Sequence, residues 1–241
     1  GTVWYAGNRA AHVGRLDPGT GEIEKLPTPD PEGAGRDPHT LIFDGAGSIW
    51  FSVQGGNSVG RLDMESGEIA LLDVPTERAR PYGIVATPSG RPWLTEFGSN
   101  KLATVDPETM ELREVALPRE DARPRRLALT SDGAVWYVDY ARGYLGRLEP
   151  ESGEIDEWPV PGGPEARPYA MASDDQDRLW FVESGPEPNR LVGFDPETGE
   201  FFATAEIPSG GGTVRHMVFH APTRTIWFGA DTNTIGRAKV P

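Results

Sequence analysis

Residues 38–69 read PHTLIFDGAGSIWFSVQGGNSVGRLDMESGEI, and this stretch decides the fold because close copies of it recur along the chain. The tryptophan at its centre is one of six that follow one another at intervals of 43 to 47 residues. A repeat of that length is typical of a β-propeller blade built from four strands. The six tryptophans are Trp4, Trp50, Trp93, Trp136, Trp180 and Trp227, and Trp158 lies outside this register.

Each copy reads as four short strands joined by turns. The segment PHTLIF at residues 38–43 stands for the first strand, the tryptophan segment for the second, and GRLDMESGEI at residues 60–69 for the third and the start of the fourth. In the last segment the Asp63 side chain can bond the backbone ahead of it, and Gly67 accepts the positive φ that closes a hairpin. Strands this short, separated by such turns, leave no room for crossover helices, so we expect antiparallel sheets.

The repeats predict an all-β fold: a single domain over residues 1–241, folded as a β-propeller with about six blades of four antiparallel strands. One blade cannot bury both of its faces, whereas stacked blades form a continuous core in which the tryptophans pack. The first copy lacks its first-strand segment and the last copy lacks its fourth, so we expect 22 strands. A seven-bladed propeller without its N-terminal part is the alternative.

The composition argues against several classes of function. The net charge of −14 gives a surface that repels phosphate backbones and anionic lipids, so we expect no nucleic-acid or membrane partner. No apolar stretch reaches the roughly 18 residues of a membrane-spanning helix, and the N-terminal residues lack the layout of a signal peptide. The absence of cysteine excludes disulfides and thiolate nucleophiles. We therefore expect a soluble monomer, in a compartment that the sequence leaves open.

A ring of unlike side chains is the first candidate site. First strands line the channel of a propeller, and the residue after the proline-type position of each first strand differs from copy to copy. A fold that repeats its backbone but varies such positions can build a binding site on a symmetric scaffold. We expect these residues to meet at one mouth of the channel, where an imidazole can serve in acid–base chemistry near neutral pH. The ring consists of His39, Tyr82, Arg125, Tyr169 and His216.

Acidic residues near the same end of the blades form the second candidate site. Three of them follow a blade tryptophan by three residues, and the fourth follows Trp227 by four. Carboxylates beside an imidazole suit a divalent cation such as Mg²⁺ or Ca²⁺. The same acids can instead pair with nearby arginines such as Arg123, since a buried carboxylate needs a partner. The four acids are Glu96, Asp139, Glu183 and Asp231.

The recurring text resembles that of the streptogramin B lyase (virginiamycin B lyase) family over essentially the whole chain. The shared pattern is Pro-(His/Tyr)-x-hydrophobic, then Asp-Gly-x-x-Trp-Phe, then Asn-x-x-Gly-Arg-Leu-Asp-Pro-x-Thr-Gly-Glu-Ile. This resemblance implies a seven-bladed lyase that uses Mg²⁺ and opens a cyclic depsipeptide antibiotic by elimination at its ester bond rather than by hydrolysis. It therefore implies a small-molecule or cyclic-peptide ligand at the channel mouth and a part in antibiotic resistance.

The resemblance also assigns roles to particular residues. It places the general base of the family at His216, in the first strand of the final copy. A metal-binding acid four residues after the final tryptophan corresponds to Asp231. The other metal-binding glutamate of the family stands two residues before the histidine, where this chain has Val214, and a second, substrate-contacting histidine corresponds to Tyr169. Two of these four positions are kept in kind, and two are lost.

The sequence leaves three functions open. In a lyase, His216 would remove the proton α to the ester carbonyl while a cation held by Asp231 and neighbouring acids polarises that carbonyl. In a hydrolase of the lactonase or esterase type, the carboxylates would hold a divalent metal. In a propeller that only binds, the mouth would hold a ligand or a partner's peptide. We favour the lyase slightly because its match names specific residues. The ligand contacts of the binding alternative are Tyr82, Tyr169, Arg125 and Arg126.

Overall fold

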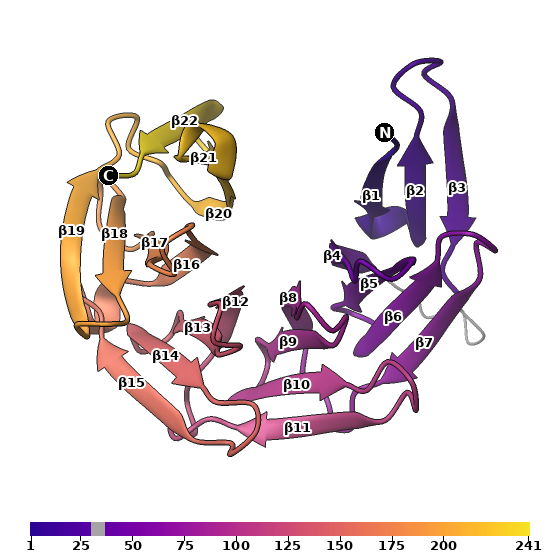
Figure 1. The fold of residues 1–241 in the computed structure, drawn as a ribbon, viewed down its shortest axis with the longest axis horizontal. Coiled ribbons are helices and arrows are strands. Elements are labelled where there is room, and N and C mark those ends of the chain that lie inside the picture. The colour runs from indigo at the N-terminus through magenta and orange to yellow at the C-terminus, as the bar shows by residue number, and fades with distance from the viewer. Residues whose placement is uncertain (30–36) are drawn as a thin grey trace. The chain divides into compact units, whose positions relative to one another are not determined.

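The computed structural model describes residues 1–29 and 37–241, and most of its regular structure is β-strand. The chain divides into two compact units, Gly1–Ala116 and Leu117–Pro241 (Figure 1). Within the described ranges, no helix is long and apolar enough to cross a membrane. The single domain expected over residues 1–241 remains a prediction.

The described part of the first unit forms three antiparallel sheets, each made of strands that follow one another along the chain. Asn8–Ala10 forms a short 3-10 helix, η1, between the first two strands. The first sheet contains β1 (Val3–Gly7), β2 (His12–Leu16) and β3 (Ile23–Pro27). The second contains β4 (Pro38–Phe43), β5 (Ser48–Val53), β6 (Ser58–Asp63) and β7 (Ile69–Asp73). The third contains β8 (Pro81–Ala86), β9 (Pro92–Glu96), β10 (Lys101–Val105) and β11 (Leu112–Ala116).

The second unit also forms three antiparallel sheets. Its two 3-10 helices are η2 (Gly163–Glu165) and η3 (Ala221–Thr223). The first sheet contains β12 (Pro124–Leu129), β13 (Val135–Asp139), β14 (Tyr144–Leu148) and β15 (Ile155–Pro159). The second contains β16 (Pro168–Ser173), β17 (Leu179–Glu183), β18 (Arg190–Asp195) and β19 (Glu200–Glu206). The third contains β20 (Val214–His220), β21 (Thr225–Ala230) and β22 (Thr234–Lys239).

These sheets confirm the prediction of an all-β propeller with six antiparallel blades. The described residues form four sheets of four strands and two of three strands. The three-stranded sheets are the first and the last, as the missing repeat segments indicate. Within the second unit, the first strands β12, β16 and β20 are packed side by side, whereas β15 and β19 lie on the far edge of their sheets (Figure 1).

The turns between the last two strands follow the predicted local chemistry. The Asp17 carboxylate accepts the backbone N–H of Gly19 at 2.7 Å, and the Asp63 carboxylate accepts that of Ser66 at 2.7 Å. Gly21 and Gly67 each adopt a φ of 77°, which an L side chain rarely tolerates. The repeated acid and glycine therefore fix the hairpins that set the register of each sheet.

The blade tryptophans pack between neighbouring sheets of each unit. Trp50 is part of the apolar core between the second and third sheets, and Trp136 of the core between the fourth and fifth. Trp158, which lies outside the repeat register, stacks on Trp136 with centroids 5.5 Å apart. Burial of large aromatic rings supplies much of the hydrophobic stabilisation of such a core, so the structural role expected for the tryptophans is confirmed.

An arginine covers the tryptophan ring in five of the described sheets. In β2 and β6 this is the arginine of the Gly-Arg-Leu motif, for example Arg61 at 5.4 Å from the Trp50 centroid. In two sheets the arginine position of this motif is occupied by Thr104 or Gly193, and an arginine from another position covers the tryptophan ring instead. The guanidinium-to-ring distances are 5.9 Å for Arg15 on Trp4, 5.8 Å for Arg113 on Trp93, 5.8 Å for Arg178 on Trp180, and 6.0 Å for Arg237 on Trp227.

A β-bulge opens the first strand of five sheets in the described chain. In each, the pairing register shifts between a proline-type residue and the hydrophobic residue three positions later, which breaks the strict alternation of faces. In β4 the Ser52 hydroxyl accepts the N–H of the bulged residue Thr40 at 3.2 Å. The shifts lie between Pro38 and Leu41, Pro81 and Ile84, Pro124 and Leu127, Pro168 and Met171, and Val214 and Met217.

The bulge register corrects one predicted equivalence. Val214 pairs with Ala230, three residues after the last blade tryptophan, and therefore holds the proline-type position of β20. The prediction that His216 shares the ring position is wrong by one residue, because the connection from β20 to the tryptophan strand is one residue longer than in the other sheets and no proline marks the start of β20. Arg215 shares that position with His39, Tyr82, Arg125 and Tyr169, whereas His216 shares the next one with Thr40, Gly83, Arg126 and Ala170.

Replacing a fully enclosed blade tryptophan should cost far more stability than replacing the exposed one. Trp136 is 1% exposed, so Trp136→Ala should lower the free energy of unfolding by about 3 to 5 kcal/mol through lost burial and a cavity. Trp227 is 38% exposed, and Trp227→Ala should cost less than half as much. Urea unfolding followed by circular dichroism measures both. Equal losses would contradict the packing described.

Candidate functional site

In the first unit, two predicted ring residues lie in contact. The His39 and Tyr82 rings have centroids 4.3 Å apart at an interplanar angle of 40°, and the Tyr82 ring lies 6.0 Å from that of Phe97. Tyr82 is buried, and His39 is half-buried with its Nδ1 3.0 Å from the Thr40 hydroxyl. The bulges of β4 and β8 thus bring an imidazole and a phenol together as a surface that can stack on a ligand ring.

In the second unit, Arg125 is stacked between two tyrosines. Its guanidinium carbon lies 4.4 Å from the ring centroids of both Tyr140 and Tyr169, and these two rings meet edge to face at 5.8 Å. Tyr169 is almost fully buried. A cation held over aromatic faces away from water contributes about 1 to 2 kcal/mol. The predicted contacts Arg125 and Tyr169 are therefore brought together.

Two residues of these clusters, Phe97 and Tyr140, were not among the predicted site residues. Each follows its blade tryptophan by four residues, the same spacing that separates Asp231 from Trp227. The sequence prediction used the third position for most copies and the fourth only for the last. Reading the fourth position in every copy would have found both aromatic side chains.

Arg215 joins the stack to the last sheet. Its Nη2 lies 2.7 Å from Asp231 Oδ2, and its guanidinium carbon lies 5.9 Å from the Tyr169 ring centroid. Hydrogen bonding to Asp231, followed by hydrogen bonding to Tyr169, raises the pKa of Arg215 above its ordinary range. The Arg215 guanidinium therefore connects the Asp231 carboxylate, just after β21, with the Tyr169 phenol of β16. The Arg215 side chain is still 55% exposed.

His216 follows Arg215 in the β20 bulge and is exposed to solvent. Burial by the protein around it, followed by the positive charge of Arg126, lowers the pKa of His216 from an ordinary 6.5 to about 4. The imidazole is therefore neutral at pH 7, with a ring nitrogen able to accept a proton.

Open space beside His216 distinguishes the last sheet from the others. Two residues after its tryptophan, β21 has Gly229, where an added side-chain carbon would meet nothing within 4 Å. A hollow of about 340 Å³ opens there, lined in part by Arg215, His216, Asp231 and Ile235. In four other sheets the position of Gly229 holds a fully buried side chain: Ser52, Thr95, Val138 or Val182.

Arg126 supports this hollow from the neighbouring blades. It is almost fully buried, and its Nε donates to the backbone carbonyl of Arg215 at 3.0 Å. This bond links β12 to β20. Strand β16 packs against both of them, and at the position equivalent to Arg126 it has only the methyl group of Ala170. Arg126 therefore fixes the backbone from which Arg215 and His216 project.

Three of the four predicted acids are buried structural groups. Glu183 lies 2.6 Å from the Arg190 guanidinium and accepts the Gly162 N–H at 2.6 Å. Asp139 accepts the backbone N–H of Arg123 at 2.8 Å, and burial raises its pKa although such hydrogen bonds oppose the shift. The Glu96 carboxylate accepts from the Ser99 hydroxyl at 2.7 Å, and burial raises the pKa of Glu96 to about 7. Glu96 thereby stabilises the loop beyond its strand, whereas Asp139 and Glu183 also bind the segments that lead into β12 and β16.

The described residues do not fit a divalent cation. Among them, no group of three or more His, Asp or Glu side chains lies close enough to hold a metal ion. Asp231 is already paired with Arg215, and Val214, beside the same bulge, is apolar and fully buried. A divalent cation favours six or more oxygen ligands with several carboxylates. The described residues thus supply no set of ligands for the divalent cation expected from the sequence.

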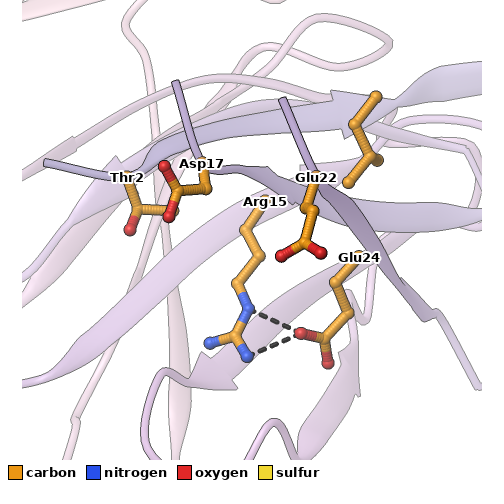
Figure 2. Close-up of a pocket in the computed structure, with 6 residues that line it drawn as sticks. Thr2, Arg15, Asp17, Glu22 and Glu24 are labelled. Atoms are coloured by element: carbon orange, nitrogen blue, oxygen red, sulfur yellow. Dashed lines mark hydrogen bonds and ion pairs between the residues drawn. The ribbon is translucent and has the colours of Figure 1, made fainter. Parts of the chain in front are cut away.

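A second hollow lies on the first sheet, away from the first-strand residues. Figure 2 shows the side chain of Arg15 turned toward that of Glu24, with Nε and Nη2 at 2.7 and 2.6 Å from one carboxylate oxygen. The charges here are paired, and the surrounding acids belong to the exposed β2–β3 turn. The residues that line it are Thr2, Arg15, Asp17, Glu22, Ile23 and Glu24.

Comparison with known proteins gives one consistent result. The sequence model of the virginiamycin B lyase family matches residues 1–238. The structure of virginiamycin B lyase from Staphylococcus aureus matches all of this chain and 81% of its own, with 25% sequence identity and a TM-score of 0.83. A catalytically inactive histidine-to-alanine variant of that lyase, solved with quinupristin, matches 98% of this chain and 80% of its own, with 25% identity and a TM-score of 0.84.

A more distant match shows only the fold. A 6-phosphogluconolactonase-like protein from Bacteroides uniformis has 16% identity and a TM-score of 0.74, over 99% of this chain and 77% of its own. No curated protein matches by direct sequence comparison.

The buried carboxyl of Glu96 should give stability a pH dependence that Glu96→Gln removes. Its pKa is about 7 in the folded state against an ordinary 4.5, so the folded state binds more protons between these values. Stability should then fall by up to about 3 kcal/mol as pH rises from about 5 to 8. Urea unfolding at both pH values, with exposed Glu151→Gln as the control, measures it. An unchanged slope in Glu96→Gln would refute this.

Proposed function

The chain belongs to the virginiamycin B lyase family, and from that premise we propose that it opens a cyclic ester-containing peptide by elimination, with His216 as the base. One observation carries the proposal. A neutral imidazole lies in an open hollow of the last sheet, beside a guanidinium and opposite a glycine that leaves room for a ligand. General base catalysis of this kind contributes about 10²- to 10⁴-fold in rate.

The proposed reaction breaks one C–H bond and one C–O bond and consumes no water. The substrate carries its ester oxygen on the carbon β to a carbonyl group. A ring nitrogen of His216 takes the proton from the carbon between them, and the electron pair of that C–H bond forms a C=C bond. The bond between the β carbon and the ester oxygen breaks, and a carboxylate leaves with its electron pair. The product is a linear peptide with one double bond and one carboxylate.

Aromatic and cationic groups of the second unit supply a surface that would hold such a ligand. Tyr169 and Arg125 form this surface. Ligand sites of proteins combine aromatic walls with a few fixed polar groups in this way. A relative of this chain has been solved with quinupristin, which makes quinupristin a suitable probe.

A binding module without catalysis is the second candidate. It is favoured by Val214 and Tyr169, which stand where the resemblance implies an acid and a histidine. A ligand that binds in the absence of divalent cations and is recovered unchanged would support it. The hydrolase alternative has less support, because the described carboxylates are paired or enclosed in loops.

Replacing His216 should abolish turnover of quinupristin. His216→Ala removes the base and should reduce kcat by about 10²-fold or more. His220→Ala is the matched control, because His220 is exposed and bonds only locally, to the Thr223 hydroxyl at 2.8 Å. Mass spectrometry follows the product, which keeps the mass of the substrate after elimination and gains one water after hydrolysis. Full activity of His216→Ala would contradict the proposal.

The activity should persist at acidic pH. A base works only when unprotonated, and the pKa of His216 lies at about 4. We therefore expect kcat/KM to be level from about pH 8 down to about pH 5.5 and to decline below about pH 4.5. Steady-state rates across this range check the expectation. A decline of kcat/KM centred near pH 6.5 would show that the pKa of His216 is not lowered by its surroundings, which would contradict this prediction.

A further inference from the structure

The His216 hollow already contains a fixed positive charge. Arg215 and His216 are consecutive in the β20 bulge and line the same hollow. Asp231 Oδ2 lies 2.7 Å from Arg215 Nη2, and Asp231 Oδ1 lies 3.4 Å from Arg215 Nε. Just over half of the Arg215 side chain is exposed, so a ligand in the hollow can reach the guanidinium.

The surroundings of Arg215 favour a guanidinium over a metal ion at this position. The Asp231 carboxylate is committed to its ion pair with Arg215, and the Glu183 carboxylate is held by Arg190. Val214 adds no oxygen ligand. A cation that entered the hollow would have to displace the guanidinium from the carboxylate, which is the one carboxylate that lines this hollow in the described chain.

We propose that Arg215 is the electrophile of this site: its guanidinium bonds the substrate carbonyl next to the proton that His216 removes. The inference rests on the proposed function. Removing that proton places negative charge on the carbonyl oxygen, and preorganised donors aimed at such an oxygen stabilise the transition state. A guanidinium has five N–H donors in a rigid plane, so those not used by Asp231 and Tyr169 are available to the substrate. The reaction then needs no divalent cation.

Arg126 acts here as a positioning residue. Its bond to the Arg215 carbonyl joins two first strands that are separated by β16, and so holds the bulge in one conformation. Its charge also opposes protonation of His216. One buried side chain thereby sets the direction of the electrophile and adds to the effect of burial, which is the larger cause of the low pKa of His216.

Turnover of quinupristin in EDTA and in millimolar MgCl₂ tests the assignment. We expect equal rates for the wild type in both, and a fall in kcat of about 10²- to 10³-fold in Arg215→Ala. Arg215→Lys keeps the charge but not the planar fork, and should be intermediate. Arg142→Ala is the matched control, because Arg142 is also exposed and pairs with an aspartate, Asp121. Activity that is lost in EDTA and restored by Mg²⁺ would overturn the inference while leaving the proposed lyase function intact.

Calorimetry with MgCl₂ alone supplies a readout that does not depend on activity. We expect no saturable binding to the wild type, and new binding to a variant that carries both Val214→Glu and Arg215→Ala, which frees Asp231 and adds a second carboxylate. Saturable binding to the wild type that disappears in Asp231→Asn would overturn the inference. Absence of turnover under every condition would instead refute the proposed function, and this titration would still decide which cation the site holds.

The positioning role of Arg126 has its own signature. Arg126→Met should raise the pKa of His216, followed by NMR, above about 4 but only part of the way to 6.5, because burial remains the larger cause, whereas Arg126→Lys should keep it low because the charge remains. Circular dichroism confirms that both variants fold. A merely structural role would leave the His216 titration of Arg126→Met unchanged, and that result would overturn this part of the inference.

Discussion

The bulge that opens each first strand is the constraint on which the candidate site depends. Regular antiparallel pairing sends successive side chains to opposite faces, whereas a bulge lets two consecutive residues serve one region. In β12 the two residues are Arg125, which stacks on tyrosines, and Arg126, which supports the backbone of β20. In β20 they are Arg215 and His216, which line one hollow. The turns and the tryptophan cores hold these strands at the spacing that the contacts require.

The partners of the acidic side chains distinguish those with a structural role from the one in the candidate site. Glu183 is held by Arg190 of β18 and by a backbone N–H before β16, and one oxygen of Asp139 accepts a backbone N–H before β12. In the last sheet, a glycine replaces the buried side chain of the other sheets, and the acid, Asp231, moves one residue onward to meet Arg215. The hollow that results has a positive guanidinium beside a neutral imidazole, the two groups that proton removal next to a carbonyl needs.

Local chemistry explains which features the sequence could predict. The Asp-Pro-x-Thr-Gly-Glu turns and the tryptophan period depend on neighbours a few residues away, so the strand order and the three-stranded end sheets were predicted correctly. The pairs His39 with Tyr82 and Arg125 with Tyr169 followed from the same register. The exact alignment of His216 did not, because counting back from Trp227 misses the one extra residue between β20 and β21. Arg190 faces Glu183 across β17 and β18, at a position that holds Ser58, Lys101 or Tyr144 in other sheets, so the repeat does not specify this partner.

The central claim is that Arg215 and His216 act together on one substrate carbonyl, and a crystal structure of His216→Ala with bound quinupristin tests it most directly. The account predicts a substrate carbonyl oxygen at about 2.7 to 3.2 Å from the Arg215 guanidinium, with the carbon that loses its proton facing the space left by the imidazole. A divalent cation lying between Asp231 and the ligand, or a ligand bound away from this hollow, would contradict it.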